Sequence, residues 1–164
     1  MSEAALLSSL DAHGIRWNLF EHEAVFTVEE SAAIHARMPG LHTKNLFLKD
    51  AGGQFWLVTA PHDASVDLKA LPAIIGSKKL SFGKSEDMEA LLGVTPGSVT
   101  PLAAFHDKTG GVRVVLDARL AEADQVNVHP LRNTATLGLS GSDLAAFLAA
   151  ICHAPLIALL PSRT

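Results

Sequence analysis

The sequence predicts a mixed α/β (α+β) fold, because helical and strand patterns alternate irregularly along the chain. Hydrophobic residues make up 48% of the 164 residues and charged residues 18%, a composition that favours a compact core over a disordered chain. The sequence shows neither an internal repeat nor a linker-like segment. We therefore expect a single domain over residues 1–164.

The expected helices carry apolar residues three or four positions apart and are bounded by capping residues or glycine. The first has Leu6 and Leu10 on its inner face and ends at Gly14. A capping box formed by Thr27 and Glu30 begins the second. In chain order, the helices are expected between Ser2 and Gly14, over 28–36, over about 66–75, between Ser85 as its cap and Gly93, and from about Ser142 onward.

The expected strands either alternate apolar and polar residues or are short apolar runs bounded by turn residues. Ala135, Leu137 and Leu139 alternate with more polar neighbours, as in a half-buried strand. Two apolar runs, 46–48 and 55–58, flank a glycine-containing turn and predict a hairpin. The remaining strands are expected at 15–20, 97–105, 112–116, 125–128 and 134–139.

Charge and cysteine content exclude several classes of protein. Thirteen Lys and Arg residues against seventeen Asp and Glu give a net charge of −4, which argues against a protein that coats nucleic acid by bulk charge. The single cysteine, Cys152, excludes an internal disulfide, and its place after Ile151 predicts a buried, inert thiol. The first residues lack the basic stretch and the long apolar run of a secretory signal, and no apolar run reaches ~20 residues. We expect a soluble, cytoplasmic protein with no membrane or DNA partner.

The sequence lacks the common cofactor motifs. It contains no Gly-rich phosphate loop followed by Lys-Ser or Lys-Thr, and no strand-turn-helix pattern with three spaced glycines. The eight histidines show no His-Glu-x-x-His pattern, and His129 has no second metal ligand near it in the sequence. We therefore expect neither a metal nor a cofactor.

Three short segments place polar residues where a binding site can form. In the first, 41–48, a polar quartet leads into an apolar strand and holds Lys44 and Asn45 at the strand's entrance. A lysine there can bind a phosphate or a developing oxyanion, and an asparagine can orient an ester carbonyl or a sugar hydroxyl. The same pattern also fits a solvent-facing turn.

The second segment is 93–101, where Pro96-Gly97 favours a tight turn and Pro101 removes a strand donor. Such a loop can direct backbone N–H groups at an anionic oxygen, although it also fits the start of an ordinary rigid hairpin. In the third, 128–133, Pro130 stops a strand and leaves His129 at its end. That position suits either a site residue or a structural histidine.

Together these segments resemble the YbaK/ProX family of aminoacyl-tRNA deacylases, relatives of the editing domain inserted in bacterial prolyl-tRNA synthetases. The Lys-Asn-Leu-Phe-Leu form at 44–48 is most similar to the free-standing ProX type. The matching stretches occur in the family's order over about residues 15–150; they are 21–22, 27–30, 42–48, 79–82, 92–101 and 129–133. The resemblance implies a barrel-like mixed β-sheet flanked by helices and a reaction that needs no metal.

The resemblance also implies an enzyme that hydrolyses the ester of a mischarged tRNA, most similar to those that clear alanine from tRNA for proline. Lys44 is expected to hold the phosphate or ribose of the terminal adenosine and Asn45 to orient the ester, while the amides of Gly97 and Ser98 hold the carbonyl oxygen. A substrate hydroxyl is the expected proton acceptor. The expected catalytic residues are Lys44, Asn45, Gly97 and His129, and the expected substrate-binding residues are Ser98, Val99, Thr100, Pro101, His22 and Thr27.

Lys49 and Lys79 flank these motifs and are the expected tRNA contacts, although lysines that only solubilise a sheet edge fit the sequence too. The expected partner is the acceptor end of a mischarged tRNA, and a prolyl-tRNA synthetase is a second candidate. Three alternatives stay open. They are the same reaction on cysteine or serine, a non-catalytic tRNA-binding module of the same fold, and an unrelated metal-dependent hydrolase.

Overall fold

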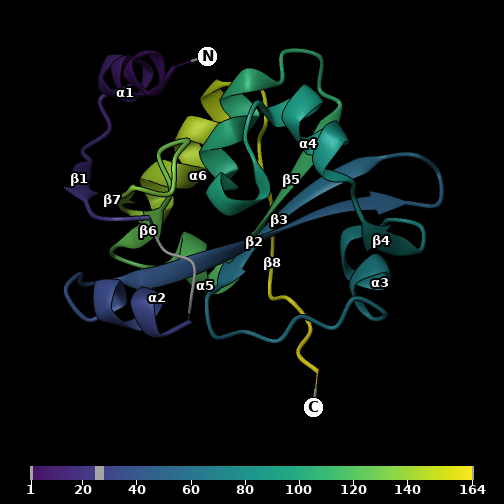
Figure 1. Ribbon diagram of the computed structural model, residues 1–164. Helices are drawn as coiled ribbons and strands as arrows, with labels where there is room; N and C mark the ends of the chain where they lie inside the picture. The colour runs from purple at the N-terminus through teal and green to yellow at the C-terminus, as the bar shows by residue number, and fades with distance from the viewer. Residues whose placement is uncertain (1, 25–27, 164) are drawn as a thin grey trace.

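The chain folds around a mixed eight-stranded sheet with helices packed against it (Figure 1). The structure is a computed structural model that describes residues 2–24 and 28–163. The strands are β1 (Asn18–Glu21), β2 (Leu41–Asp50), β3 (Phe55–Pro61), β4 (Leu80–Phe82), β5 (Val112–Asp117), β6 (Val126–Val128), β7 (Ala135–Leu139) and β8 (Leu156–Ala158). The helices are α1 (Glu3–Ala12), α2 (Val28–His35), α3 (Leu71–Ile75), α4 (Ser85–Leu92), α5 (Ala118–Ala121) and α6 (Gly141–Ala150), with 3₁₀ helices η1 (Pro96–Ser98) and η2 (Pro101–His106).

The strand order is β1-β7-β6-β2-β3-β5-β8, and β4 pairs with β2 outside this path. β2 runs antiparallel to β3 and β4 and parallel to β6, whereas the β3–β5 and β5–β8 pairs are parallel. This mixed sheet with flanking helices confirms the predicted fold class. No helix among residues 2–24 and 28–163 is long and apolar enough to cross a membrane.

The β2–β3 hairpin, which runs across the centre of Figure 1, separates two hydrophobic clusters because side chains of a strand alternate between its faces. Leu48 and its cross-strand partner Trp56 pack into the cluster on the α3 side. Phe47 and its partner Leu57 pack into the opposite cluster, which α4 and η2 complete. A third cluster joins α1 and α6 to β5, β6 and β7. The face on which any β2 side chain lies is thereby fixed.

The prediction of a strand over 97–105 is wrong, because this segment forms η1 and η2 instead. Each 3₁₀ helix has a proline at its start, where the missing N–H costs nothing and the fixed φ favours a helical turn. The Thr100 hydroxyl accepts the Leu102 N–H at 3.3 Å and caps η2. Two prolines and one capping threonine therefore outweigh the apolar run that suggested a strand.

The helix expected over 66–75 is confined to α3, over residues 71–75. Upstream of it, the Asp67 carboxylate accepts the N–H groups of Lys69 and Ala70 and forms a turn, and Pro72 stands at the beginning of the helix. The expected cap at Ser85 is one residue too far along the chain. Lys84 is the N-cap of α4, and it has no side-chain capping bond.

Three further details differ from the expectations. β2 begins at Leu41, so the polar quartet lies inside the strand rather than before it. β4, α5 and β8 were not expected, since segments of three or four residues carry too little periodicity to be recognised. Cys152 is exposed rather than buried, because α6 ends at Ala150 and Cys152 follows in a turn with a φ of 67°. Thr27, the expected cap of α2, lies outside the described residues.

Candidate active site

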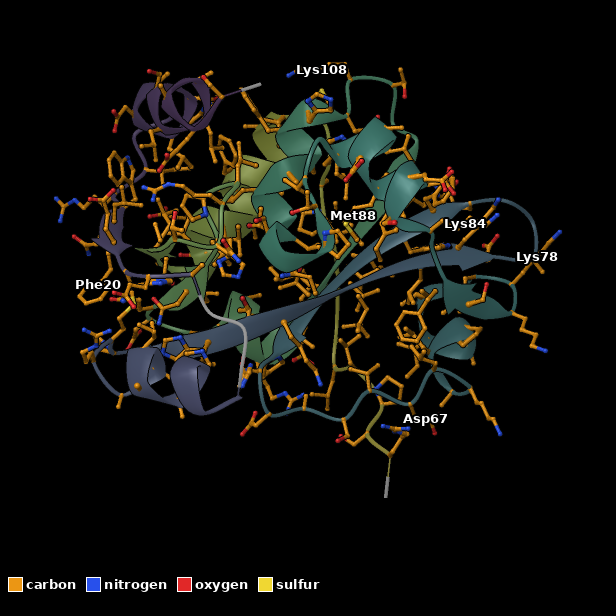
Figure 2. The ribbon with its side chains drawn as sticks, viewed as in Figure 1. Phe20, Asp67, Lys78, Lys84, Met88 and Lys108 are labelled. Atoms are coloured by element: carbon orange, nitrogen blue, oxygen red, sulfur yellow. The ribbon has the colours of Figure 1, made fainter. Side chains whose placement is uncertain are left out.

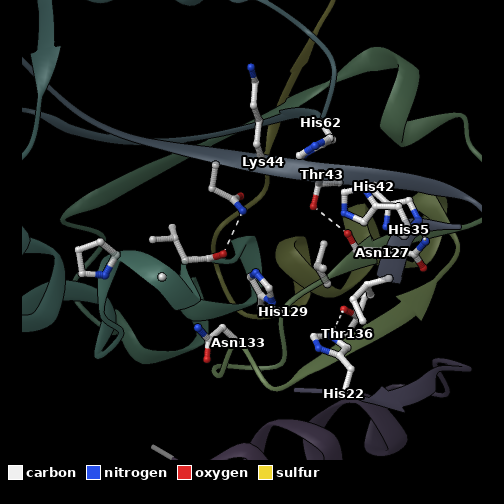
Figure 3. Close-up of a pocket in the computed structure, with 16 residues that line it drawn as sticks. His22, His35, His42, Thr43, Lys44, His62, Asn127, His129, Asn133 and Thr136 are labelled. Carbon is white, nitrogen blue, oxygen red and sulfur yellow. Dashed lines mark hydrogen bonds between the residues drawn. The ribbon is translucent and has the colours of Figure 1, made fainter. Parts of the chain in front are cut away.

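A cavity of about 230 Å³ opens between β2, η1 and the β6–β7 loop (Figure 3). Its volume lies below the range of about 300–1,000 Å³ that is usual for drug-sized ligands, which suits a small chemical group. From the sequence-predicted residues the cavity brings together His22, Lys44, Asn45, Gly97, Val99 and His129. It is also lined by Ile34, His35, His42, Thr43, His62, Pro96, Asn127, Val128, Asn133 and Thr136.

Asn45 lies on the cavity side of β2 and ties the strand to the loop that carries Gly97. Its Oδ1 accepts the Thr59 hydroxyl at 2.7 Å across the β2–β3 pair, and its Nδ2 donates to the Val99 carbonyl at 3.0 Å. The amide is therefore held at both ends. One N–H bond of Nδ2 is left over, and that bond can contact a ligand.

Lys44 precedes Asn45 in the strand, so its side chain leaves the opposite face of β2. Figure 3 shows Lys44 on one side of the strand and His129 on the other. The Lys44 ammonium donates a hydrogen bond to the Ala64 carbonyl, in the segment after β3. Lys44 is half-buried in the middle of a long strand, whereas the sequence predicted a strand end.

The loop predicted to bind the substrate reaches the cavity only through Pro96, Gly97 and Val99. Gly97 lies in the first turn of η1, where N–H groups have no acceptor within the helix, so its amide suits an anionic oxygen. The Ser98 N–H instead donates to the Thr95 carbonyl at 2.9 Å and is not free for a substrate. Ser98, Thr100 and Pro101 are buried and lie outside the lining.

His129 follows β6 directly, and burial lowers its pKa below the ordinary 6.5, so the ring is neutral at pH 7. Its Nδ1 lies 3.4 Å from the Ala135 carbonyl. A carbonyl can only accept, so Nδ1 carries the proton and Nε2 remains an acceptor for a ligand hydroxyl. His22 is different because both of its ring nitrogens are engaged, Nδ1 with the Glu23 carbonyl at 2.8 Å and Nε2 with the Thr136 hydroxyl at 2.9 Å.

Arg132 anchors the β6–β7 loop that carries His129 and Asn133. Its guanidinium pairs with Glu3 of α1 at 3.0 Å and with Glu21 of β1 at 2.9 Å. These ion pairs are partly exposed, so each contributes at most about 1 kcal/mol to stability. Their main effect is to fix the loop relative to the N-terminal elements.

Three histidines from different elements meet at the end of the cavity that α2 covers. The ring of His35 stacks on His42 with centroids 3.9 Å apart and meets His62 edge-on at 4.5 Å. Burial, followed by repulsion from His42, His62 and His129, lowers the pKa of His35 to about 4. Burial is likewise the main cause that lowers the pKa of His42. His35 and His42 are therefore uncharged at neutral pH.

Sequence reasoning missed several lining residues. Asn127 lies between two valines of β6 and is 2% exposed. Its side-chain amide donates to the Pro39 carbonyl at 2.9 Å, and its main-chain carbonyl accepts a hydrogen bond from the Thr43 hydroxyl. An asparagine between two valines of a predicted strand was the feature of the sequence that could have identified Asn127 as a candidate site residue. His42 and Asn133 stood inside recognised motifs, but His35 and His62 had no local signal that linked them.

The two lysines expected to contact tRNA lie outside the cavity, near one end of the β2–β3 hairpin. Lys49 is exposed on β2, and its ammonium lies 5.2 Å from the centre of the Phe55 ring. Lys79 is exposed just before β4, and its carbonyl accepts the Ala51 N–H. Among the described side chains, which are those of residues 2–24 and 32–163, no three His, Cys, Asp or Glu residues are grouped as ligands for a metal ion.

The cavity lies inside a segment with a recognisable family signature. The family model for the aminoacyl-tRNA editing domain matches residues 22–147, a range that contains every lining residue named above. The chain belongs to this family. Membership confirms the class of enzyme predicted from the sequence, an aminoacyl-tRNA deacylase.

Relatives extend over nearly the whole chain. The prolyl-tRNA editing protein ProX of Acetoanaerobium sticklandii is 41% identical over 144 residues, covering 87% of this chain and 88% of that protein. Prolyl-tRNA synthetase associated domain-containing protein 1 of Bos taurus is 42% identical over 159 residues, covering 94% and 92%. A solved structure described as a candidate trans-editing enzyme for prolyl-tRNA synthetase superposes with a TM-score of 0.75 at 20% identity, covering 99% of each chain, and so supports the fold.

Proposed function

We propose that the protein acts in trans on alanine wrongly attached to tRNA for proline and releases it by hydrolysis. The observation that carries this proposal is the small cavity in which Gly97, Asn45 and His129 converge beside Lys44. The names of the relatives, a prolyl-tRNA editing protein and a prolyl-tRNA synthetase associated protein, support proline tRNA as the carrier.

The residues of the cavity suit an ester that is already activated. Water adds to the ester carbonyl, and the Gly97 amide donates to the oxygen as it becomes negative, an interaction typically worth about 10²–10³ in rate. The neutral His129 accepts a hydrogen bond from a ribose hydroxyl through Nε2 and so orients the sugar. The bond between the acyl carbon and the ribose oxygen then breaks, and the leaving oxygen gains a proton. In this proposal the neighbouring hydroxyl of the substrate, and no protein side chain, accepts the proton of the attacking water and passes its own proton to the leaving ribose oxygen.

Selection of alanine follows from size. Ile34, Val99 and Val128 are the branched aliphatic side chains of the described lining, and all three are buried. In the proposed mode of binding, these side chains narrow the end of the cavity that receives the amino acid, so that a methyl group fits there and the proline ring is excluded by steric overlap. Glycine is discriminated less well, because one missing methyl changes the binding free energy by only about 1–3 kcal/mol.

The proposed partner is the acceptor end of a mischarged tRNA, and association with prolyl-tRNA synthetase is proposed on the relatives' names alone. Because aminoacyl-tRNA for translation is a cytoplasmic substrate, we also propose that the protein works in the cytoplasm. Lys49 and Lys79 are proposed to contact the tRNA outside the cavity.

A panel of charged tRNAs tests this function. Purified protein in EDTA is expected to deacylate alanyl-tRNA(Pro) and to leave prolyl-tRNA(Pro) intact, as followed by release of radiolabelled amino acid. Seryl- and cysteinyl-tRNA(Pro) are the matched alternatives, and a higher kcat/KM on either would reassign the amino acid. Loss of activity on chelation, restored by zinc, would indicate a metal-dependent hydrolase. Binding of tRNA without hydrolysis of any substrate would indicate a non-catalytic module.

A further inference from the structure

A second hollow, of about 700 Å³, lies on the face of β2 opposite Asn45 and has no role in the reaction described above. We call it the Phe82 groove. It is bounded by Lys44, Leu46 and Phe82 on the sheet, by residues 65–69 after β3, and by Arg163 near the C-terminus. Figure 2 shows Asp67 of this segment beside the C-terminal end of the chain.

Phe82 is the most exposed large apolar side chain of the groove. Its side chain lies on the same face of the sheet as Leu48, with which it pairs, and 66% of its surface is exposed. An exposed aromatic ring in a hollow offers a flat surface on which a planar group can stack. Every nucleobase has such a face, which is why aromatic side chains form stacking platforms for single-stranded nucleic acid.

The charge of the groove favours an anion. Its lining in the described part of the chain includes three cations, Lys44, Lys69 and Arg163, against one carboxylate. That carboxylate, from Asp67, already accepts the N–H groups of Lys69 and Ala70. Lys69 and Arg163 are exposed, so their charged groups can reach a phosphate. An aromatic surface with cations beside it is the combination that binds a nucleotide.

The groove and the active-site cavity meet at Lys44, which lines both. At this point one edge of β2, the edge away from β3, has no strand of the described residues paired with it. On that edge β2 pairs with β6 only at residues 41–42 and with β4 only at residues 48–50. The Phe47 carbonyl accepts the Gly83 N–H on this side, whereas the His42 carbonyl accepts the His62 N–H on the β3 side. Because these directions alternate along a strand, the main-chain N–H and C=O of Asn45 face the unpaired edge between β6 and β4.

We propose that the Phe82 groove binds the unpaired nucleotides that precede the terminal adenosine of the aminoacylated strand. This inference rests on the proposed function, which places the aminoacyl ester in the cavity beside Lys44. The aminoacylated RNA strand passes Lys44 at the unpaired edge of β2, where the main-chain N–H and C=O of Asn45 can contact it. A base stacks on Phe82, and Lys69 and Arg163 bind the phosphates.

Substrate length tests the proposal. The measured quantity is the ratio of kcat/KM on an aminoacylated trinucleotide, cytidine-cytidine-adenosine, to kcat/KM on aminoacyl-adenosine. The wild-type ratio is expected to be roughly fivefold to a hundredfold, the range that stacking one base on an aromatic ring spans. Phe82→Leu is expected to lower the ratio at least about fivefold, and Phe82→Trp, which keeps an aromatic face, to preserve it. Lys69→Ala/Arg163→Ala is expected to lower the ratio and to weaken its dependence on salt.

Lys108→Ala is the matched control, because Lys108 is also an exposed lysine and lies far from Asp67 in Figure 2. Binding of the uncharged trinucleotide, measured by calorimetry, gives a second reading that needs no activity, and Phe82→Leu is expected to weaken it at least fivefold. The proposal would be overturned if Phe82→Leu bound the trinucleotide as tightly as the wild type and kept the wild-type kcat/KM ratio. It would also be overturned if Phe82→Leu lowered kcat/KM on intact tRNA but not on the aminoacylated trinucleotide. If the wild type binds the trinucleotide through Phe82 but hydrolyses nothing, the proposed function fails and the groove assignment stands.

Discussion

Lys44 and Asn45 are neighbours in the sequence, yet they reach opposite sides of the sheet. The Asn45 amide connects β2 to the η1 loop inside the cavity, whereas the Lys44 ammonium lies at the boundary between cavity and groove. A direct contact of Lys44 with the reacting carbonyl does not fit this placement. Contact with the phosphate or ribose of the terminal nucleotide does fit it, because the proposed path of the aminoacylated RNA strand passes this boundary.

The substitution Lys44→Met tests the role of the charge at this position. Met keeps most of the side chain's apolar length but removes the hydrogen bond to the Ala64 carbonyl. Loss of one such bond costs about 1 kcal/mol, so Tm is expected to fall by only about 2–4 °C. The value of kcat/KM on alanyl-tRNA(Pro) is expected to fall at least about tenfold, or ~1.4 kcal/mol of transition-state stabilisation.

Lys44→Arg is the matched variant, because it keeps the positive charge, and it is expected to retain more activity than Lys44→Met. Thermal unfolding followed by circular dichroism shows whether each variant is folded. A folded Lys44→Met protein with wild-type kcat/KM would remove Lys44 from the mechanism.

At the scale of elements, sequence patterns predicted most of the longer helices, and they failed where prolines and capping side chains determine the backbone conformation. α1, α4 and α6 were expected because their apolar residues repeat at helical spacing, α2 because of the capping-box spacing at its start, and β7 because it alternates. The η1–η2 segment reads as an apolar strand in sequence, but Pro96 and Pro101 start two 3₁₀ turns. The cavity could be anticipated because its motifs resemble a family. The stacked histidines could not, since their partners are separated by up to 27 residues and meet only after α2 packs on the hairpin.

The contact between α2 and the hairpin is expected to weaken in acid. The pKa of His35 is lowered from 6.5 to about 4, so between these values the unfolded chain binds a proton that the folded chain excludes. The free energy of unfolding therefore falls as the pH falls from about 6.5 to about 4. His42 and His129, whose pKa values are also lowered, change stability in the same direction.

His35→Phe isolates the contribution of His35, because phenylalanine keeps a flat ring against His42 and does not titrate. The decrease of Tm between pH 7 and pH 5 is expected to be smaller in this variant than in the wild type. Thermal unfolding at pH 7, 6 and 5 gives the comparison. Equal decreases in both proteins would mean that His35 protonation does not destabilise the fold.

At the scale of the whole molecule, the net charge of −4 opposes a polyanionic substrate, so tRNA affinity must come from local patches. Lys49 is exposed on β2 and Lys79 is exposed just before β4, which pairs with β2; Lys78 and Lys84 lie at the same end of the molecule in Figure 2. In the proposed binding mode, the active-site cavity and the Phe82 groove hold the unpaired end of the tRNA, and the lysine-bearing end of the hairpin is proposed to contact the base-paired acceptor stem.

The double variant Lys49→Ala/Lys79→Ala is therefore expected to bind tRNA more weakly at low salt while its hydrolysis of aminoacyl-adenosine persists. Each phosphate contact with a duplex contributes about 0.9 to the slope of log K against log salt, so loss of two contacts lowers that slope by roughly 2. Filter binding over a range of salt concentrations measures both affinity and slope. Lys108→Ala/Arg16→Ala, which removes two exposed cations elsewhere, is the control for net charge. If the two double variants bind tRNA equally well, bulk charge rather than a lysine patch governs recognition, and the acceptor stem lies on another surface.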